Sequence, residues 1–348
     1  MVRQASFAVP GDLATPTGGY AYDRRIIAEL SALGWRIEVI NLGDGFPYPA
    51  ADTRAAACAR LAALPTGHPV VIDGLAFGVL PEIAAALRAS HPLLALVHHP
   101  LALESGLSAA DSASLHASER SALGCARHVI ATSATIARLL VDDYGVAAGR
   151  VSVVEPGTDR VLAPPRNSEG VVKLLAVGSV IPRKGYDVLV AALARLRHLP
   201  WRLVVAGDCE CSPETSRRLS TDIVRLGLAD RITLLGAVAA EKVAPLYASA
   251  DLFVLPSRFE GYGMAYAEAI VHGVPVIGTT AGAIAQTVPA EAGVLVAPDD
   301  VEALAAALQR LIANPDERER LAAGARAAKF PSWSEQAALF ARALESLA

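Results

Sequence analysis

The chain has 348 residues, enough for two domains of ordinary size or one large domain. Hydrophobic residues make up 53% of it and aromatic residues only 5%, so its apolar content is mainly aliphatic. This content excludes a largely disordered chain, and the glycine and cysteine counts exclude a collagen-like or disulfide-based scaffold. The net charge of -4 argues against a nucleic-acid-binding protein.

The longest stretch without Asp, Glu, Lys or Arg runs over residues 269–290. It is long enough to span a bilayer, but its glycines and prolines predict a helix end, a short strand and a loop instead. The N-terminus lacks the apolar segment of a signal peptide, and the four cysteines form no CxxC pair. We therefore expect a cytoplasmic protein.

Short apolar runs alternate with helical patterns through the first half of the chain. The runs ASFAVP, WRIEVINL, HPVVID, LLALVHH, HVIATS and VSVVEPG predict strands. Helices are expected at 20–33, 51–64, 81–90 and 133–144, the last capped by Ser133. Such alternation is typical of a parallel sheet covered by helices on both faces.

A segment rich in proline, glycine and polar residues follows at 155–170, and the same alternation then restarts. We expect an N-terminal domain over 1–165, a C-terminal domain over 166–330, and an amphipathic helix within 331–348 that packs back toward the N-terminal domain. Both domains are predicted to be doubly wound α/β structures. Ligands of such sheets bind beyond the carboxyl ends of the strands.

Two strand ends carry residues suited to an anionic ligand. Gly18 and Gly19 follow the first strand and allow close backbone approach to a phosphate, although they do not form a GxGxxG motif. Arg183 and Lys184 follow the first strand of the second half, and two adjacent cations there suit a diphosphate. Taken singly, each feature is also compatible with an ordinary turn.

Glu260 and Glu268 form an E-x7-E pattern around a glycine-rich loop and the start of a helix at 265–271. The free N–H groups around Gly261–Met264 would bind an anion. The Glu268 carboxylate, one to two turns into the helix, could accept hydrogen bonds from two ribose hydroxyls. The structural alternatives are a helix cap for Glu260 and a helix-dipole partner for Glu268.

His98 and His99 end the strand LLALV, and Glu104 follows nearby. An imidazole at a strand end can hydrogen-bond a substrate. Adjacent histidines on an extended chain point in opposite directions, so they do not suggest a metal site. We favour His98 because it follows the strand directly, and we rank His99 and Glu104 as weaker, acceptor-side candidates.

Taken together, these motifs resemble those of retaining glycosyltransferases of the family 4 type. The resemblance covers essentially the whole chain and rests on VGSVIPRKGYDVLVAAL, WRLVVAGD and LYASADLFVLPSRFEGYGMAYAEAIVHGVPVIGT, with looser matches in the first half. It implies the GT-B fold, with two facing Rossmann-like domains, and transfer of a hexosyl unit from a nucleotide sugar to an acceptor hydroxyl. It also implies a UDP-sugar rather than a GDP-sugar as donor.

The resemblance implies roles for individual residues. Arg183 and Lys184 would bind the donor diphosphate and Glu268 the ribose, while Glu260 and His98 would contact the donor sugar. The remaining donor-binding residues it implies are Gly18, Gly19, Ser179, Val238, Gly261, Tyr262, Gly263 and Met264.

The sequence departs from the family pattern at three places. Ser179 replaces a common arginine, EPGTD lacks the usual asparagine, and Gln286 replaces a usual acid. We expect neither a metal nor another cofactor, because Arg183 and Lys184 would take the place of the metal.

The acceptor is not specified by the sequence. The first half is net acidic and contains no lysine, which favours a soluble acceptor over a membrane lipid. Peripheral contact with the inner membrane face remains an open alternative. The alternative functions are a sugar-nucleotide epimerase or sugar phosphorylase of the same fold, and a non-catalytic nucleotide-sugar-binding protein.

Overall fold

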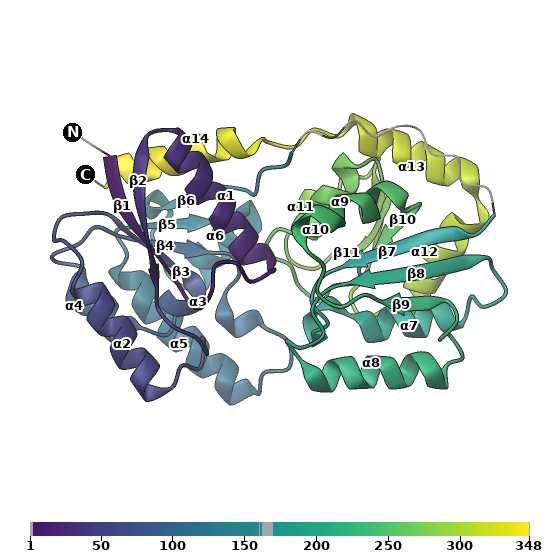
Figure 1. Ribbon diagram of the computed structural model, residues 1–348, viewed down its shortest axis with the longest axis horizontal. Coiled ribbons are helices and arrows are strands. Elements are labelled where there is room, and N and C mark those ends of the chain that lie inside the picture. The colour runs from purple at the N-terminus through teal and green to yellow at the C-terminus, as the bar shows by residue number, and fades with distance from the viewer. Residues whose placement is uncertain (1–2, 160, 162–169, 348) are drawn as a thin grey trace. The chain divides into compact units, whose positions relative to one another are not determined.

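The computed structural model describes residues 3–159, 161 and 170–347 and divides into two compact units (Figure 1). Unit 1 comprises Met1–Gly157 together with Pro331–Ala348, and unit 2 comprises Thr158–Phe330. Residues 160 and 162–169 of the expected linker lie outside the described part.

Unit 1 is built on a six-stranded parallel sheet with the order β2-β1-β3-β4-β5-β6. Strands β3, β4 and β5 are almost entirely buried, as expected for central strands covered on both faces. The strands are β1 (Arg3–Val9), β2 (Trp35–Asn41), β3 (Val70–Asp73), β4 (Leu93–Val97), β5 (His128–Ala131) and β6 (Val151–Val153).

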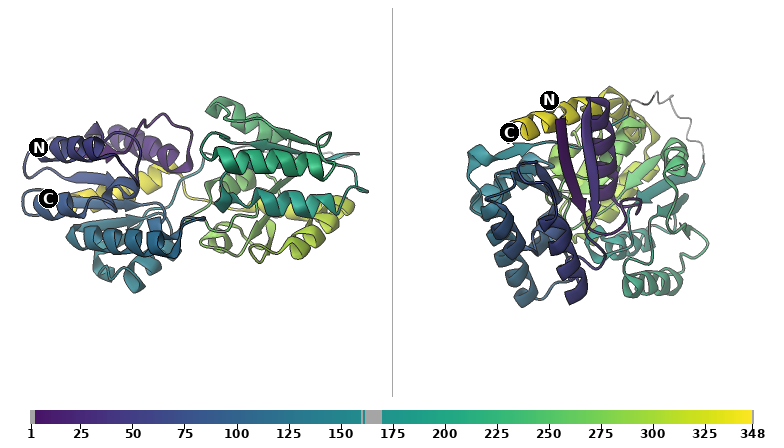
Figure 2. Two further views of the ribbon diagram at one scale, coloured as in Figure 1. Left: turned by 90° about the horizontal axis from the view of Figure 1, so that it is seen from below. Right: turned by 60° about the vertical axis from the view of Figure 1, so that its left-hand side comes forward.

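Helices cover both faces of this sheet (Figure 2). They are α1 (Gly18–Ala32), α2 (Ala51–Ala62), α3 (Gly74–Phe77), α4 (Pro81–Leu87), α5 (Ala109–Cys125), α6 (Ala134–Asp142) and α14 (Trp333–Glu345), with short 3₁₀ helices η1 (Leu101–Leu103) and η2 (Ala148–Arg150). Ser133 caps α6 by accepting a hydrogen bond from the Ile136 amide, as predicted.

The last helix, α14, packs on α1 although it follows all of unit 2 in the sequence (Figure 1). Phe340 of α14 is fully buried, and its ring lies 6.2 Å from that of Phe7 on β1. At the start of the helix, a Cβ atom added to Gly157 would lie 2.3 Å from the Trp333 amide nitrogen. The close approach of these two segments therefore requires glycine at 157.

Unit 2 is built on a second six-stranded parallel sheet, with the order β12-β11-β10-β7-β8-β9. Its strands are β7 (Val172–Val177), β8 (Trp201–Ala206), β9 (Ile232–Leu234), β10 (Leu252–Val254), β11 (Val276–Thr279) and β12 (Gly293–Val296). Its helices are α7 (Tyr186–Ala194), α8 (Pro213–Arg225), α9 (Ala240–Ser249), α10 (Met264–Val271), α11 (Ile284–Thr287), α12 (Val301–Ala313) and α13 (Pro315–Ala327), with the 3₁₀ helix η3 (Pro182–Lys184).

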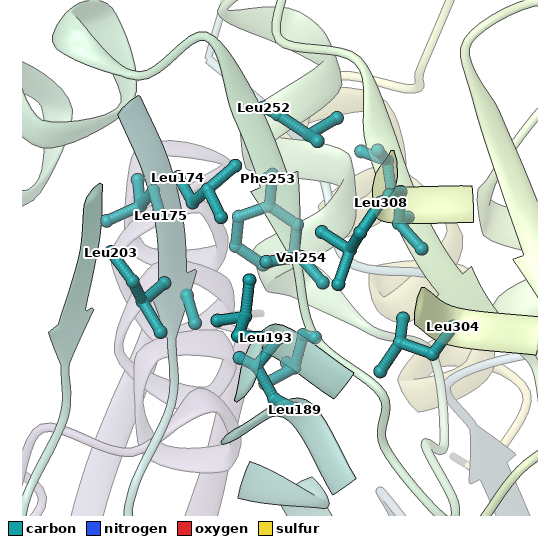
Figure 3. Close-up of a cluster of buried hydrophobic side chains, with 14 of the residues drawn as sticks. Leu174, Leu175, Leu189, Leu193, Leu203, Leu252, Phe253, Val254, Leu304 and Leu308 are labelled. Carbon is teal, nitrogen blue, oxygen red and sulfur yellow. The ribbon is translucent and has the colours of Figure 1, made fainter. Parts of the chain in front are cut away.

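Leucine and valine side chains dominate the core of unit 2, and only a few aromatic rings join them. Figure 3 shows the central part, where side chains from β7, β8 and β10 meet those of α7 and α12. The aliphatic excess of the sequence is thus buried in the two sheets and the helices that cover them.

The uncharged stretch 269–290 lies within this core. It contains the end of α10, the whole of β11 and the short helix α11, so the predicted helix end, strand and loop are confirmed, with one helical turn inside the loop. No helix among the described residues is long and apolar enough to cross a membrane.

The strand orders determine where ligand sites are expected. In each sheet, successive strands are added first on one side of the first strand and then on its other side. The direction of strand addition therefore reverses between β1 and β3 in unit 1 and between β7 and β10 in unit 2. Loops at the carboxyl ends of such strand pairs diverge and leave room for a ligand. Gly18–Gly19 and Asp73 lie at these strand ends in unit 1, and Arg183–Lys184 and Glu260 lie beyond them in unit 2.

Candidate functional site

In unit 2, three predicted site residues form one ion-pair cluster. The Lys184 Nζ atom lies 2.7 Å from Glu260 Oε1, and Arg183 Nη1 lies 3.2 Å from Glu260 Oε2. Arg183 also donates to the carbonyl oxygen of Phe259 at 2.9 Å. The two cations after β7 therefore hold the carboxylate after β10 between them.

The backbone of these two loops makes the close approach possible. Gly185, directly after Lys184, has a positive φ of 68°, and a Cβ atom there would lie only 2.1 Å from the Pro256 carbonyl oxygen. The Arg258 amide donates to the Arg183 carbonyl oxygen at 2.7 Å. Glycine at 185 thus lets the loop after β7 lie directly against the loop after β10.

The surroundings of Glu260 keep it ionised. Burial alone would raise the pKa of this carboxyl, but Lys184 and Arg183, with a hydrogen bond from Ser257 Oγ at 2.7 Å, lower the pKa to about 2. Two cations and one carboxylate leave the cluster with a formal charge of +1. A diphosphate placed beside it would meet a net positive site.

The glycine-rich loop 261–263 leads directly into α10. Gly263 forms the N-cap with a φ of 94° and makes no side-chain cap bond, so Glu260 is not the helix cap considered as its structural alternative. The Met264 and Ala265 amides donate to no other group in the described part of the chain. The N-terminus of α10 therefore presents these two free N–H groups, and whether they bind an anion stays a prediction.

Glu268 lies on α10, apart from the ion-pair cluster, and interacts with different residues. Its Oε2 atom accepts a hydrogen bond from the Tyr247 hydroxyl at 2.9 Å. The Tyr247 ring stacks against His272, whose Nδ1 atom lies 2.7 Å from the Glu268 carbonyl oxygen. Burial raises the pKa of Glu268, and the bond from Tyr247 opposes that effect.

Two further predicted donor residues lie in loops of unit 2. Ser179 follows β7 and is partly buried, as is Val238 in the loop between β9 and α9. Both loops follow carboxyl ends of strands, consistent with the predicted location of a ligand.

In unit 1, His98 forms a second cluster of charged groups. Its Nε2 atom lies 3.1 Å from Asp23 Oδ1 and 3.3 Å from Asp73 Oδ2. Asp23 is fully buried on α1, while Asp73 ends β3 and caps α3 through its other oxygen, which accepts from the Leu75 amide. Burial alone would lower the pKa of His98, but the two carboxylates raise it well above its usual range.

The histidine ring also packs against the start of α1. A Cβ atom added to Gly19 would lie 3.4 Å from His98 Cδ2. Gly18 and Gly19 lie in the first turn of α1, two residues earlier than the predicted helix start, because the Thr17 side chain caps the helix by accepting from the Tyr20 amide. The Gly18 and Gly19 amides donate to no group among the residues described.

His99 and Glu104 lie outside this cluster. The His99 Nε2 atom is 3.9 Å from Glu104 Oε2, whereas the ion pairs of His98 are with Asp23 and Asp73. His98 is thus the histidine held beside the glycine turn, and its role toward a donor sugar stays a prediction.

Sequence reasoning missed four residues that shape these clusters: Asp23, Asp73, Tyr247 and Ser257. Two of them carried a usable signal. Asp73 ends the apolar run VVI, as His98 ends its own strand. Asp23 precedes Ile26 and Leu30 on the buried face of α1, where a charged side chain is destabilising unless it forms an ion pair or hydrogen bond.

Comparisons with known proteins agree with this architecture. Residues 171–314 match the family described as "Glycosyl transferases group 1", and residues 22–161 match "Glycosyltransferase Family 4". Together with two doubly wound parallel sheets, these matches define a glycosyltransferase of the GT-B fold. The chain belongs to glycosyltransferase family 4.

Two relatives illustrate the similarity in sequence. The chain is 30% identical over 314 residues to MMP alpha-(1->4)-mannosyltransferase of Mycolicibacterium hassiacum, covering 84% of this chain and 74% of that protein. It is 35% identical to D-inositol 3-phosphate glycosyltransferase of Thermomonospora curvata, over 58% of this chain and 52% of that one. The chain thus spans only about half the length of the second relative.

Solved structures show the same fold at lower identity. Sucrose-phosphate synthase of Thermosynechococcus elongatus matches with a TM-score of 0.82 at 23% identity over 99% of both chains. HepE of Anabaena, in complex with UDP-glucose, matches with a TM-score of 0.77 at 19% identity over 98% of this chain and 99% of that one.

Proposed function

We propose that this glycosyltransferase moves a hexosyl unit from a UDP-sugar to an acceptor hydroxyl, with retention at the anomeric carbon and without a metal ion. The observation that carries the proposal is the cluster of Arg183, Lys184 and Glu260, which has a net charge of +1 and follows the two strands where the sheet order reverses. A UDP-sugar is favoured over a GDP-sugar because HepE, of the same fold, was solved with UDP-glucose.

In this proposal the bond between the anomeric carbon and the diphosphate oxygen breaks, and the acceptor oxygen forms a bond on the same face. The acceptor proton passes to the departing diphosphate. Negative charge grows on that diphosphate in the transition state, so Arg183, Lys184 and the free amides of α10 would stabilise it. Because these groups are held in place before the donor arrives, little reorganisation is needed.

The remaining predicted residues take part in donor binding. Glu268 would accept hydrogen bonds from the ribose hydroxyls, and Val238 would meet the base through its backbone. Glu260, already ionised between its two cations, would accept from a hydroxyl of the donor sugar.

A small, soluble acceptor in the cytoplasm is part of the same proposal. One group of relatives is named for D-inositol 3-phosphate, a small phosphorylated polyol. The absence of lysine from residues 1–165 also gives little support for docking on an anionic membrane.

The test uses the purified full chain with UDP-hexoses and GDP-hexoses, each with and without EDTA. Release of UDP is measured in the presence of D-inositol 3-phosphate and of simple sugar phosphates, and NMR gives the anomeric configuration of the product. We expect UDP release, a retained configuration and no effect of EDTA. Lys184→Met should abolish turnover, whereas Lys242→Met, at an exposed site of the same unit, should not.

Other outcomes identify the alternatives. An epimerised donor without acceptor transfer would indicate an epimerase. A requirement for inorganic phosphate with release of sugar 1-phosphate would indicate a phosphorylase. Tight binding of the nucleotide sugar without turnover for any acceptor would favour the non-catalytic protein, and an inverted product would refute retention.

A further inference from the structure

His98 has an unusual set of partners at one ring nitrogen. Two carboxylate oxygens, from Asp23 and Asp73, lie within 3.3 Å of Nε2, although that nitrogen can carry only one proton. If Nε2 were unprotonated, its lone pair would face two carboxylate oxygens and be repelled. Nε2 therefore carries its proton and shares it between the two acceptors.

The second ring nitrogen is left for a ligand. No described residue forms a hydrogen bond with Nδ1, and 23% of the side chain remains exposed. The backbone of His98 is fixed by Thr132, whose hydroxyl donates to the His98 carbonyl oxygen at 3.1 Å. The edge of the Tyr22 ring and the backbone at Gly19 hold the imidazole from two other sides.

The charge of the ring determines what Nδ1 can do. In a neutral imidazole with its proton on Nε2, Nδ1 is an acceptor, whereas in the imidazolium it is a donor. Two carboxylates beside one imidazole favour the charged form because each adds an attractive interaction that the neutral ring lacks. The Oδ2 atom of Asp23 is buried and has no hydrogen-bond partner in the described structure, so the His98 ring is the main group that stabilises this carboxylate.

We propose that Asp23 and Asp73 are positioning residues that hold His98 doubly protonated, so that its Nδ1–H group donates a hydrogen bond to a hydroxyl of the bound sugar. The sugar ligand rests on the proposed function, whereas the charge of the ring does not. A hydroxyl suits this place better than a phosphate, because one imidazolium and two carboxylates have a formal charge of -1.

Other titratable and charged groups near the ring do not reverse this balance. Tyr20, Tyr22 and Arg24 lie on α1 beside the cluster, while Asp12 in the loop before α1 and Asp44 in the loop after β2 act on Tyr20. Burial raises the pKa of Asp23 to about 6, while His98 and, more weakly, Arg24 lower it, so Asp23 is ionised over most of the range tested. The pKa values of both tyrosines are raised, so the phenols stay neutral over the range tested.

The first experiment measures the ring directly, without any donor. The full chain is labelled with ¹⁵N-histidine, the His98 signals are assigned with His98→Gln, and the ring nitrogens are followed from pH 6 to pH 9. We expect both nitrogens to stay protonated over this range in the wild type. In Asp23→Asn and Asp73→Asn the ring should lose its charge at lower pH, because removing one nearby opposite charge shifts a pKa by about 1–3.

The second experiment measures the affinity for a UDP-hexose as a function of pH. The wild-type affinity should be constant from pH 6 to pH 9. Asp73→Asn should bind nearly as well as the wild type at pH 6 and about tenfold more weakly at pH 9, since a charged donor is replaced by a neutral group. A merely structural role of Asp73 would weaken binding equally at both pH values.

Glu119→Gln is the matched control, because Glu119 is a buried carboxyl of unit 1 whose Oε2 atom accepts from the Leu101 amide and which is not among the groups that shift the pKa of His98. It should leave the His98 titration unchanged. Asp23 is fully buried, so Asp23→Asn could fail to fold, which circular dichroism would show. In that case the His98 titration and the affinity measurements of Asp73→Asn alone test the proposal.

Three results would overturn the inference. The first is a wild-type His98 that loses its charge near pH 6.5, the ordinary pKa of histidine. The second is a titration that neither asparagine variant changes. The third is a set of His98 signals that shift with Zn²⁺ and return with EDTA, which would replace hydrogen bonding by metal coordination. A doubly protonated ring in a protein that binds no nucleotide sugar would instead refute the proposed function, and with it the hydroxyl ligand.

Discussion

Lys184 and Glu260 offer the sharpest test of how the unit 2 cluster is held together. We consider Lys184→Met, Glu260→Gln and the double variant. Methionine keeps most of the alkyl chain, whose Cε atom packs near Gly178, while removing the charge that lies 2.7 Å from Glu260 Oε1. Glutamine keeps the shape of Glu260 and removes its charge.

The magnitude follows from the pKa of Glu260. A fall from 4.5 to about 2 corresponds to about 3 kcal/mol of folding free energy, at ~1.4 kcal/mol per pKa unit. Arg183 and Ser257 share this effect, so we assign roughly half of it, ~1.5 kcal/mol, to Lys184. Because the pKa is lowered on folding, this stabilisation is fully present above pH 4.5 and is lost as the pH falls through about 2.

The assay is chemical unfolding of the full chain at pH 7, followed by fluorescence. We expect Lys184→Met to lower the free energy of unfolding by ~1.5 kcal/mol, equivalent to a fall in Tm of about 3–6 °C for a domain of this size. The double-mutant cycle should give a coupling of similar size between positions 184 and 260. A coupling near zero, or an equal loss in Lys242→Met, would refute the assignment of a buried ion pair.

Three further predictions concern other parts of the molecule. Glu268→Ala should weaken UDP binding, measured by calorimetry, at least tenfold, since two hydrogen bonds to a charged group are lost. Tyr247→Phe should weaken UDP binding less, because the Glu268 carboxylate remains. Equal effects of the two variants would contradict a direct role of Glu268. Gly185→Ala should lower the free energy of unfolding of unit 2 by ~3 kcal/mol or more, because the added Cβ atom meets the backbone of Pro256. Gly236 also has a positive φ but has open space around it, so Gly236→Ala should cost only ~1 kcal/mol in the same unfolding assay. Burial raises the pKa of Glu119 to about 8, so the native state favours the protonated carboxyl and is destabilised when the pH rises above the ordinary pKa of glutamate. Glu119→Gln removes this cost and should therefore stabilise unit 1 at pH 8 but not at pH 4. A gain in stability that is independent of pH would contradict this explanation.

The sequence predicts the fold well because the physical signal for it is local. Buried parallel strands are apolar on both faces, so the strand ends could be predicted, and with them the loops that hold the predicted site residues: His98 directly follows β4, and Arg183 and Glu260 lie in the loops after β7 and β10. The helix boundaries were less accurate. The predicted helix at 81–90 ends at Leu87, and that at 133–144 covers only Ala134–Asp142, because hydrophobic periodicity does not mark the last turn.

What the sequence did not reveal was the pairing among site residues. Lys184 and Glu260 are 76 positions apart, and Asp23 and His98 are 75 apart, so only the strand order brings them together. The two cations were expected to bind the donor diphosphate, and in the structure part of their charge is balanced by Glu260. Tyr247 was missed because a tyrosine before a buried strand looks like a core residue until the partner of its hydroxyl is known.

The position of α14 has a consequence for the order in which the protein matures on the ribosome. Unit 2 is continuous in sequence and can complete its fold while the chain is still being made, whereas unit 1 must wait for the last residues to emerge before Phe340 and Trp333 reach their places. Until then, the apolar surface of α1 and β1 that α14 covers is exposed to the cell. The first half of the chain to be synthesised is thus the last to be finished, and during synthesis it is the half most dependent on protection from aggregation.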